Sequence, residues 1–223
     1  LKLVGSTIVL LGSQTRFMIG SALTRTSIID VTANCIGTMQ YFFDARPRTV
    51  EGTEHPGSSF LMVRDCNFYQ SGSDGFLISL TDHHFTNMEY NSFICDGGNM
   101  NVLLIGKGDN TSFQGNSYST SSSYTKVLHV EADDVIILDE VFIIQGEETH
   151  AIDLTGMRDK VWGCSMTSFG SGHLIMLGGL DNTILSTSLL VPDFSIFESN
   201  PASESGLNIP TLFVYPGESI SLT

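Results

Sequence analysis

The stretch that decides the fold is NSFICDGGNMNVLLIGKGDNTSFQGNSY, residues 91–118. It begins with Asn91-Ser92-Phe93 and ends with Asn116-Ser117-Tyr118, so a similar triplet returns after 25 residues. One period earlier the chain has Cys66-Asn67-Phe68. Self-similarity at a fixed period of about 20 to 50 residues is the signature of repeat architectures. The sequence therefore predicts a chain built from coils of about 25 residues.

The same period extends over most of the chain. Apolar or aromatic residues, with one threonine, recur at Phe17, Phe43, Phe68, Phe93, Tyr118, Phe142, Thr167 and Leu189. The steps between them are 26, 25, 25, 25, 24, 25 and 22 residues. We predict that the aromatic members from Phe43 to Phe142 stack as one inward column, which is a core feature more often than a ligand platform.

The residues between these anchors indicate strands. Short runs such as Phe76 to Leu80, Val102 to Ile105 and Val141 to Ile144 are rich in β-branched and other apolar residues, and most are bounded by Gly, Asn, Asp or Ser. No helical spacing of apolar residues is sustained over three turns. Two or three strands in each period predict an all-β parallel β-helix, in which successive coils stack about 4.8 Å apart.

Two segments depart from the repeat. Residues 44–57 contain two prolines, two arginines and two glycines, and we interpret them as a loop inserted into the β-helix of residues 1–195. Residues 196–223 are predicted to be a C-terminal linker with short strands. Because the end of a solenoid exposes unpaired backbone groups, this segment would cap the solenoid or contact a neighbouring subunit.

Composition excludes several functions. The 223 residues include 10 Lys and Arg against 24 Asp and Glu, a net charge of −14, while 41% are hydrophobic and 15% charged. The apolar content argues against a wholly disordered chain. The small number of Lys and Arg residues argues against nucleic-acid binding. No apolar run approaches the roughly 18 to 20 residues that a membrane span needs, so we expect no membrane insertion. The four cysteines have no short-motif spacing and are expected to be free thiols: Cys35, Cys66, Cys95 and Cys164.

The period also aligns residues that could carry chemistry. His84, Asp109, Asp134 and Asp159 follow one another at 25 residues, and Asp181 follows at 22. In one column, neighbouring carboxylates would lie about 5 Å apart, the separation found in retaining glycosidases. Such a pair would be catalytic in a polysaccharide hydrolase or lyase. The three carboxylates of Asp109, Asp134 and Asp159 would equally suit calcium, and no other cofactor is expected.

The alternative is that these aspartates are turn residues, since Asp and Asn tolerate left-handed backbone conformations. His84 adjoins His83, and consecutive side chains of a strand point to opposite faces, so at most one of them is outward. An outward histidine near a carboxylate can act as a general base, although a lone surface histidine is the commoner case.

Residues 131–148 hold seven carboxylates and no Lys or Arg, which indicates a solvated face, or a cation site or contact with a basic partner.

The coil length, the Asn-x-aromatic triplets and the Gly, Asp and Asn turns resemble the pectate-lyase-like superfamily, and in style bacteriophage spike and fibre proteins. The resemblance covers about residues 17–195 and implies a single-stranded right-handed parallel β-helix. It also implies polysaccharide binding or cleavage, and trimeric components of virions. No catalytic residue is carried over, because the pectate-lyase pattern has a catalytic arginine on the sheet face and Arg158 is the only arginine after Arg64.

Two hypotheses follow. In the first, the chain is a structural or host-recognition protein of a virion, such as a phage spike, fibre or capsid-associated protein. It would be a homo-oligomer, in which a trimer is favoured, and would contact other virion proteins or a host-surface polysaccharide. In the second it is a polysaccharide depolymerase that uses carboxylates on adjacent coils. Few charges and many Ser, Thr and Asn residues favour the first, and both place the protein on a virion or outside the cell.

Overall fold

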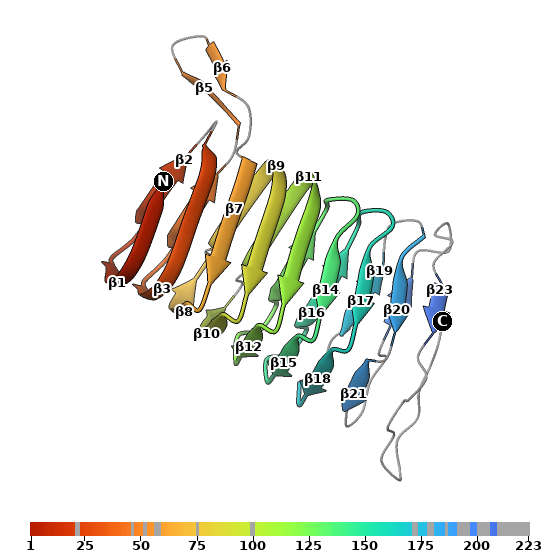
Figure 1. Ribbon diagram of the computed structural model, residues 1–223. Helices are drawn as coiled ribbons and strands as arrows, with labels where there is room; N and C mark the ends of the chain where they lie inside the picture. Colours follow the sequence, from red (N-terminus) through yellow and green to blue (C-terminus); the bar gives the residue numbers. More distant parts are fainter. Residues whose placement is uncertain are drawn as a thin grey trace.

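The computed structural model describes residues 1–20, 23–45, 47–50, 53–55, 59–74, 76–98, 101–170, 174–177, 181–185, 187–190, 197–199 and 206–208. These residues form strands and turns with no helix, so none of their segments is a long apolar helix of the kind that spans a membrane. The strands wind into a parallel β-helix with coils stacked along one axis (Figure 1). The predicted fold class is confirmed.

Each coil contributes to three sheets. Sheet A, the front layer in Figure 1, holds the first halves of β1 (Lys2–Leu11) and β3 (Thr24–Ile36), β7 (Ser59–Arg64), the second halves of β9 (Phe76–Glu89) and β11 (Asn101–Gln114), β14 (Ile136–Leu138), β17 (Lys160–Trp162), β20 (Thr183–Leu185) and β23 (Gly206–Asn208). Sheet B holds the second halves of β1 and β3, β8 (Asn67–Ser73), β10 (Ser92–Gly98), β12 (Ser117–Thr120), β15 (Val141–Ile144), β18 (Ser165–Ser168) and β21 (Ser188–Leu190). Sheet C holds β2 (Arg16–Gly20), β4 (Tyr41–Ala45), the first halves of β9 and β11, β13 (Lys126–Val130), β16 (His150–Leu154), β19 (Ile175–Leu177) and β22 (Phe197–Ser199).

Coil length is not constant. Side chains that meet their counterparts in the next coil show this, because Asn91 and Asn116 are separated by 25 positions, and Asn116 and Glu140 by 24. Further along, Asp159 and Asn182 are hydrogen-bonded at a separation of 23. Each shortening moves the later columns by one residue relative to a strict repeat.

The insertion lengthens one coil by about ten positions. Ser27 pairs with Met62, whereas one coil earlier Lys2 pairs with Ser27. The extra chain includes an antiparallel hairpin of β5 (Arg48–Val50) and β6 (Thr53–His55), which projects from the stack in Figure 1. The loop was predicted over residues 44–57, but Asp44 is buried in β4, so the departure from the coil comes after that strand.

A column of aromatic rings runs through the core. The ring centroids of Phe68 and Phe93 are 5.0 Å apart, those of Phe93 and Tyr118 5.1 Å, and those of Tyr118 and Phe142 4.7 Å. All are buried and nearly parallel, because in-register stacking brings equivalent positions of neighbouring coils into contact. This part of the predicted column is confirmed.

One predicted member of the column, Phe43, was misplaced, and two anchors of the repeat, Phe17 and Thr167, also lie outside it. Phe43 faces Met18 and Ile78 in sheet C, whereas its neighbour Phe42 packs edge-on against Phe68 at 5.1 Å. The segment between Phe43 and Phe68 includes the insertion. A separation of 25 residues therefore connects a position in sheet C with a position in sheet B.

Phe17 stacks on Phe42 and not on Phe43. At the other end Phe142 pairs with Met166, and Thr167 lies one position beyond the column, because this coil is one residue shorter than a strict repeat. Met166 pairs in turn with Leu189, as the column requires.

Two further predictions concern the cysteines and the C-terminal segment. All four cysteines are free and buried, as predicted. Within residues 196–223, the structure describes only β22 and β23, which pair in parallel with β19 and β20. These two triplets add one more strand to each of two sheets, and the rest of the segment lies outside the described residues.

Candidate functional site

The corner between sheets C and A has a left-handed residue in each coil. From β7 onward the backbone φ angles of these residues lie between 52° and 62°, at Phe60, Phe85, Asn110, Asp134, Arg158 and Asp181. The predicted turn conformation is therefore confirmed for Asp134 and Asp181, but Asp109 and Asp159 are not left-handed. The turn exposes two consecutive side chains, as His84 and Phe85 illustrate. This is the corner at which the molecule presents most of its candidate chemistry.

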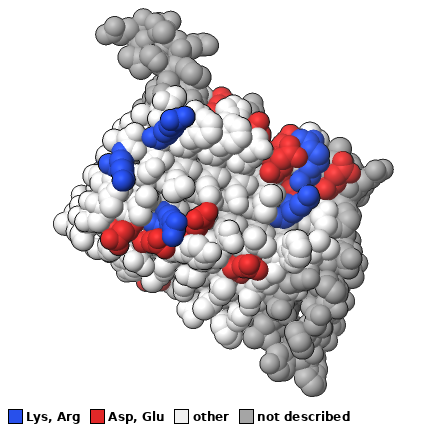
Figure 2. All heavy atoms as spheres, in the orientation of Figure 1, with Lys and Arg blue, Asp and Glu red and all other residues white. Residues whose placement is uncertain are grey.

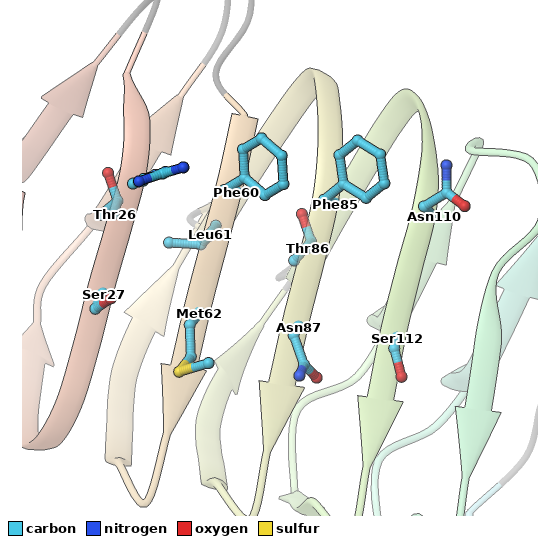
Figure 3. Close-up of a pocket in the computed structure, with 11 residues that line it drawn as sticks. Thr26, Ser27, Phe60, Leu61, Met62, Phe85, Thr86, Asn87, Asn110 and Ser112 are labelled. Carbon is cyan, nitrogen blue, oxygen red and sulfur yellow. The ribbon is translucent and has the colours of Figure 1, made fainter.

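A groove of about 440 Å³ opens on sheet A beside this corner (Figure 3). Four strands line it, with the residues Arg25, Thr26, Ser27, Phe60, Leu61, Met62, Phe85, Thr86, Asn87, Asn110 and Ser112. The Phe60 and Phe85 rings are parallel within 5°, with centroids 4.8 Å apart, and each ring is about half exposed at 50% and 48%. Two exposed stacked rings give the groove an apolar centre.

Polar groups surround these rings. Asn110 lies beside Phe85, and Met62, Asn87 and Ser112 form a row next to the rings in Figure 3. Among the described residues that line the groove, Arg25 alone is charged. Figure 2 shows a largely uncharged area over the middle of this face. The groove therefore offers amides, hydroxyls and apolar surface rather than a strongly charged surface.

A histidine and an aspartate pair at the edge of the groove. His84 Nδ1 and Asp109 Oδ1 are 2.7 Å apart, and both side chains are about half exposed. The hydrogen bond from His84 lowers the pKa of Asp109. His83 is buried, and burial lowers its pKa to about 4, so His84 is the outward histidine of the two. Its role as a general base stays a prediction.

The predicted carboxylate column is wrong beyond Asp109. That residue bridges to Asp133, one position before Asp134. Asp134 accepts two hydrogen bonds from Arg158, at 2.8 Å from Nε and 2.7 Å from Nη2, and these lower its pKa. The aspartates separate into different columns because the coil that follows Asp109 is one residue shorter than the coil before it.

Asp159 lies in a different environment from the other two aspartates. It is fully buried, its Oδ1 accepts the Val135 backbone N–H at 2.9 Å, and burial raises its pKa to about 7. Asp109, Asp134 and Asp159 therefore do not face one another as a catalytic pair or a calcium cage. In the part of the chain that the structure describes, no group of three or more His, Cys, Asp or Glu is arranged to hold a metal ion.

The acidic stretch 131–148 is not one solvated face. Glu140 within it is fully buried, and its Oε1 accepts hydrogen bonds from the backbone N–H and Nδ2 of Asn116, both at 3.0 Å. Burial raises the pKa of Glu140 to about 8. The residue serves the interior of the molecule and is not available to a cation or a basic partner.

A second polar cluster lies on sheet C. Asp153 Oδ2 is 2.7 Å from His129 Nδ1 and 2.5 Å from Lys126 Nζ, and His129 Nε2 is 3.2 Å from Glu131 Oε1. Only 5% of the Asp153 side chain is exposed. Sequence reasoning missed this cluster. His129 and Asp153 are separated by 24 residues and not by 25, and this shorter coil is evident only from the pairing of the strands. Its groups already satisfy one another, and they do not line the groove on sheet A.

Sequence reasoning also missed the two groove phenylalanines. Phe60 and Phe85 are one full period apart, so the period itself could have found them. This exposed pair of rings differs from the inward aromatic column only by its place in the coil.

Comparisons with known proteins give a fold-level likeness. No family model matches the chain, and no curated protein matches its sequence. Among solved structures, a double mutant of the tailspike protein of E. coli bacteriophage HK620 is similar, with a TM-score of 0.44 and 11% identity. The alignment covers 89% of this chain and 43% of that one, so this chain spans less than half of the tailspike's length.

Proposed function

We propose that the β-helix is a host-recognition surface, which binds a stretch of uncharged glycan in the sheet A groove as part of a virion. The exposed Phe60 and Phe85 stack at the centre of the groove is the single observation that carries the proposal. Sugars have apolar C–H faces and hydroxyl rims, and they bind where aromatic rings adjoin donors and acceptors. Asn87, Asn110 and Ser112 supply such groups.

The form of the groove also supports an extended ligand. It crosses four parallel strands, and a chain that lies along the solenoid axis meets an equivalent position about every 4.8 Å. The strands that carry the lining residues are hydrogen-bonded in one continuous sheet, so the contact groups are ordered before binding. Preorganisation of this kind lowers the entropic cost of association.

The experiment measures binding of neutral and acidic oligosaccharides by calorimetry to wild type and to Phe60→Ala. Loss of one ring contact should weaken binding of the neutral glycan about 5- to 30-fold, which corresponds to roughly 1 to 2 kcal/mol. Phe169→Ala is the matched control, because that ring is 63% exposed and lies outside the groove. An equal loss in both variants, or no glycan binding by wild type, would refute the proposal.

The depolymerase hypothesis is tested in the same samples by an assay for released reducing ends. The separation of Asp109, Asp134 and Asp159 favours binding over carboxylate-pair hydrolysis. Release that Asp134→Asn abolishes would favour the enzyme instead. The trimer expected from the sequence belongs to the same proposal, and light scattering measures it directly.

A further inference from the structure

Three residues with nucleophilic, basic and acidic side chains occupy one outward row at the edge of the groove. Ser59 of β7 pairs in register with His84 of β9, and His84 pairs in register with Asp109 of β11. Both steps are one full period, before the coils shorten. In-register residues of neighbouring coils lie about 4.8 Å apart and point to the same side. The topology thus places a serine, a histidine and an aspartate side by side in that order.

The hydrogen bonding of the histidine fits this order. His84 Nδ1 is joined to Asp109 Oδ1 at 2.7 Å, on the side of the row away from Ser59. A carboxylate on Nδ1 holds the imidazole in the tautomer whose Nε2 carries a lone pair. Nδ1 and Nε2 lie on different sides of the ring, which leaves Nε2 free to face the serine side of the row or the solvent. His84 and Asp109 are 54% and 44% exposed, and Ser59 is partly exposed, so a substrate can reach the row.

The row also has a binding surface beside it. Ser59, His84 and Asp109 each come directly before a residue that lines the groove, namely Phe60, Phe85 and Asn110. An ester held against the two rings would have its carbonyl next to the row. Neither Ser59 nor this use of the groove is needed for glycan binding alone.

We propose that Ser59, His84 and Asp109 are the nucleophile, the general base and the orienting carboxylate of an esterase that acts on carboxylic esters, such as an acyl group on a sugar hydroxyl. Ser59 Oγ attacks the ester carbonyl while its proton passes to His84 Nε2. The C–O bond to the alcohol breaks, and His84 returns the proton to the leaving oxygen. Water then attacks the acyl-serine, its proton passes to His84, and the bond to Ser59 Oγ breaks with return of that proton. The products are one carboxylic acid and one alcohol, and no oxidant or cofactor is consumed.

A fluorophosphonate probe tests the row without any glycan, because it reacts covalently with serines that a neighbouring base activates. We expect mass spectrometry to find the probe on Ser59 and to find none on Ser59→Ala. His84→Ala should slow the labelling at least about 100-fold, the scale of general-base catalysis, and Asp109→Asn should also slow it. Ser165→Ala, at an exposed serine on sheet B, should label as wild type does.

Hydrolysis of 4-nitrophenyl acetate provides the second measurement and should follow the same order of variants. The side chains of the row are at least partly exposed, so the substitutions should leave the thermal melting curve unchanged, and this is measured alongside. Absence of probe on Ser59 in wild type overturns the proposal. So does labelling of Ser59 that is unaffected by both His84→Ala and Asp109→Asn. If Phe60→Ala loses glycan binding but Ser59 is still labelled, the groove binds glycan through Phe60 and the reactivity of Ser59 does not depend on that binding.

Discussion

Two corners of the same coils use left-handed turns in different ways. At the corner between sheets A and B, Asp65, Tyr90 and Asp139 have φ angles of 54° to 55°, and each is followed by a buried residue. At the corner between sheets C and A, the turn residue and the one before it both reach solvent, as His84 and Phe85 do. Both corners use a left-handed turn residue. Exposure to solvent distinguishes them: the buried side chains of the A–B corner stabilise the protein, and the exposed side chains of the C–A corner can bind a ligand.

The buried corner is a ladder of side-chain hydrogen bonds. Asn116 Oδ1 accepts two hydrogen bonds from Asn91, one from the backbone N–H at 2.8 Å and one from Asn91 Nδ2 at 2.9 Å. Asn116 Nδ2 in turn donates to the Met88 carbonyl at 2.9 Å, and Glu140 Oε1 continues the ladder in the next coil. Backbone groups that the turn frees from the sheet are thereby satisfied, which is why polar residues are tolerated in a core.

The largest effect is expected from Asn116→Ala. It leaves the two Asn91 donors without their acceptor and should lower the free energy of unfolding by about 3 kcal/mol or more. Asn110→Ala, at the exposed corner, should cost only about 1 kcal/mol, chiefly for the left-handed backbone. Urea unfolding measures both variants. Equal losses would remove the distinction between the corners.

An effect that depends on pH is expected from Glu140→Gln. Burial raises the Glu140 pKa from 4.5 to about 8, so the folded state holds a proton that the unfolded state releases. The contribution of this group to stability is therefore complete below about pH 4.5 and is lost as pH rises through about 8. Glutamine keeps the acceptor and stays neutral, so the variant should be more stable than wild type at pH 9 and equally stable at pH 4. Parallel stability curves from pH 4 to 9 would contradict the buried, protonated state.

The smallest effect is expected from Asp134→Asn at the exposed corner, because asparagine removes the charge and still tolerates the left-handed backbone of this position. Its partner Arg158 is about half exposed, and exposed ion pairs contribute little to stability. The thermal midpoint should stay close to that of wild type at physiological salt, as calorimetry can measure. A marked fall in the midpoint would mean that this corner also holds the fold together.

Much of the fold follows from the period, because in-register stacking makes side chains one period apart touch. Phe68, Phe93 and Tyr118 could be placed from their spacing alone, and their rings do stack. Phe43 could not, since the period does not reveal that the insertion shifts it to another sheet. For the candidate site, the pairing of His84 with Asp109 follows from the same spacing, whereas only the tertiary structure defines the groove around Phe60.

The amino-acid sequence determined the repeat, because strand and turn preferences are local properties that recur with the coil. It also determined the polar turns and the small number of Lys and Arg residues. The exact length of each coil depended on packing against its neighbours, and one residue gained or lost moves every later side chain to another column. Tertiary packing therefore separated Asp109 from Asp134, buried Asp159 and Glu140, and left Phe60 and Phe85 open to solvent. Burial and contact across coils depend on the whole stack, and no single stretch of sequence encodes them.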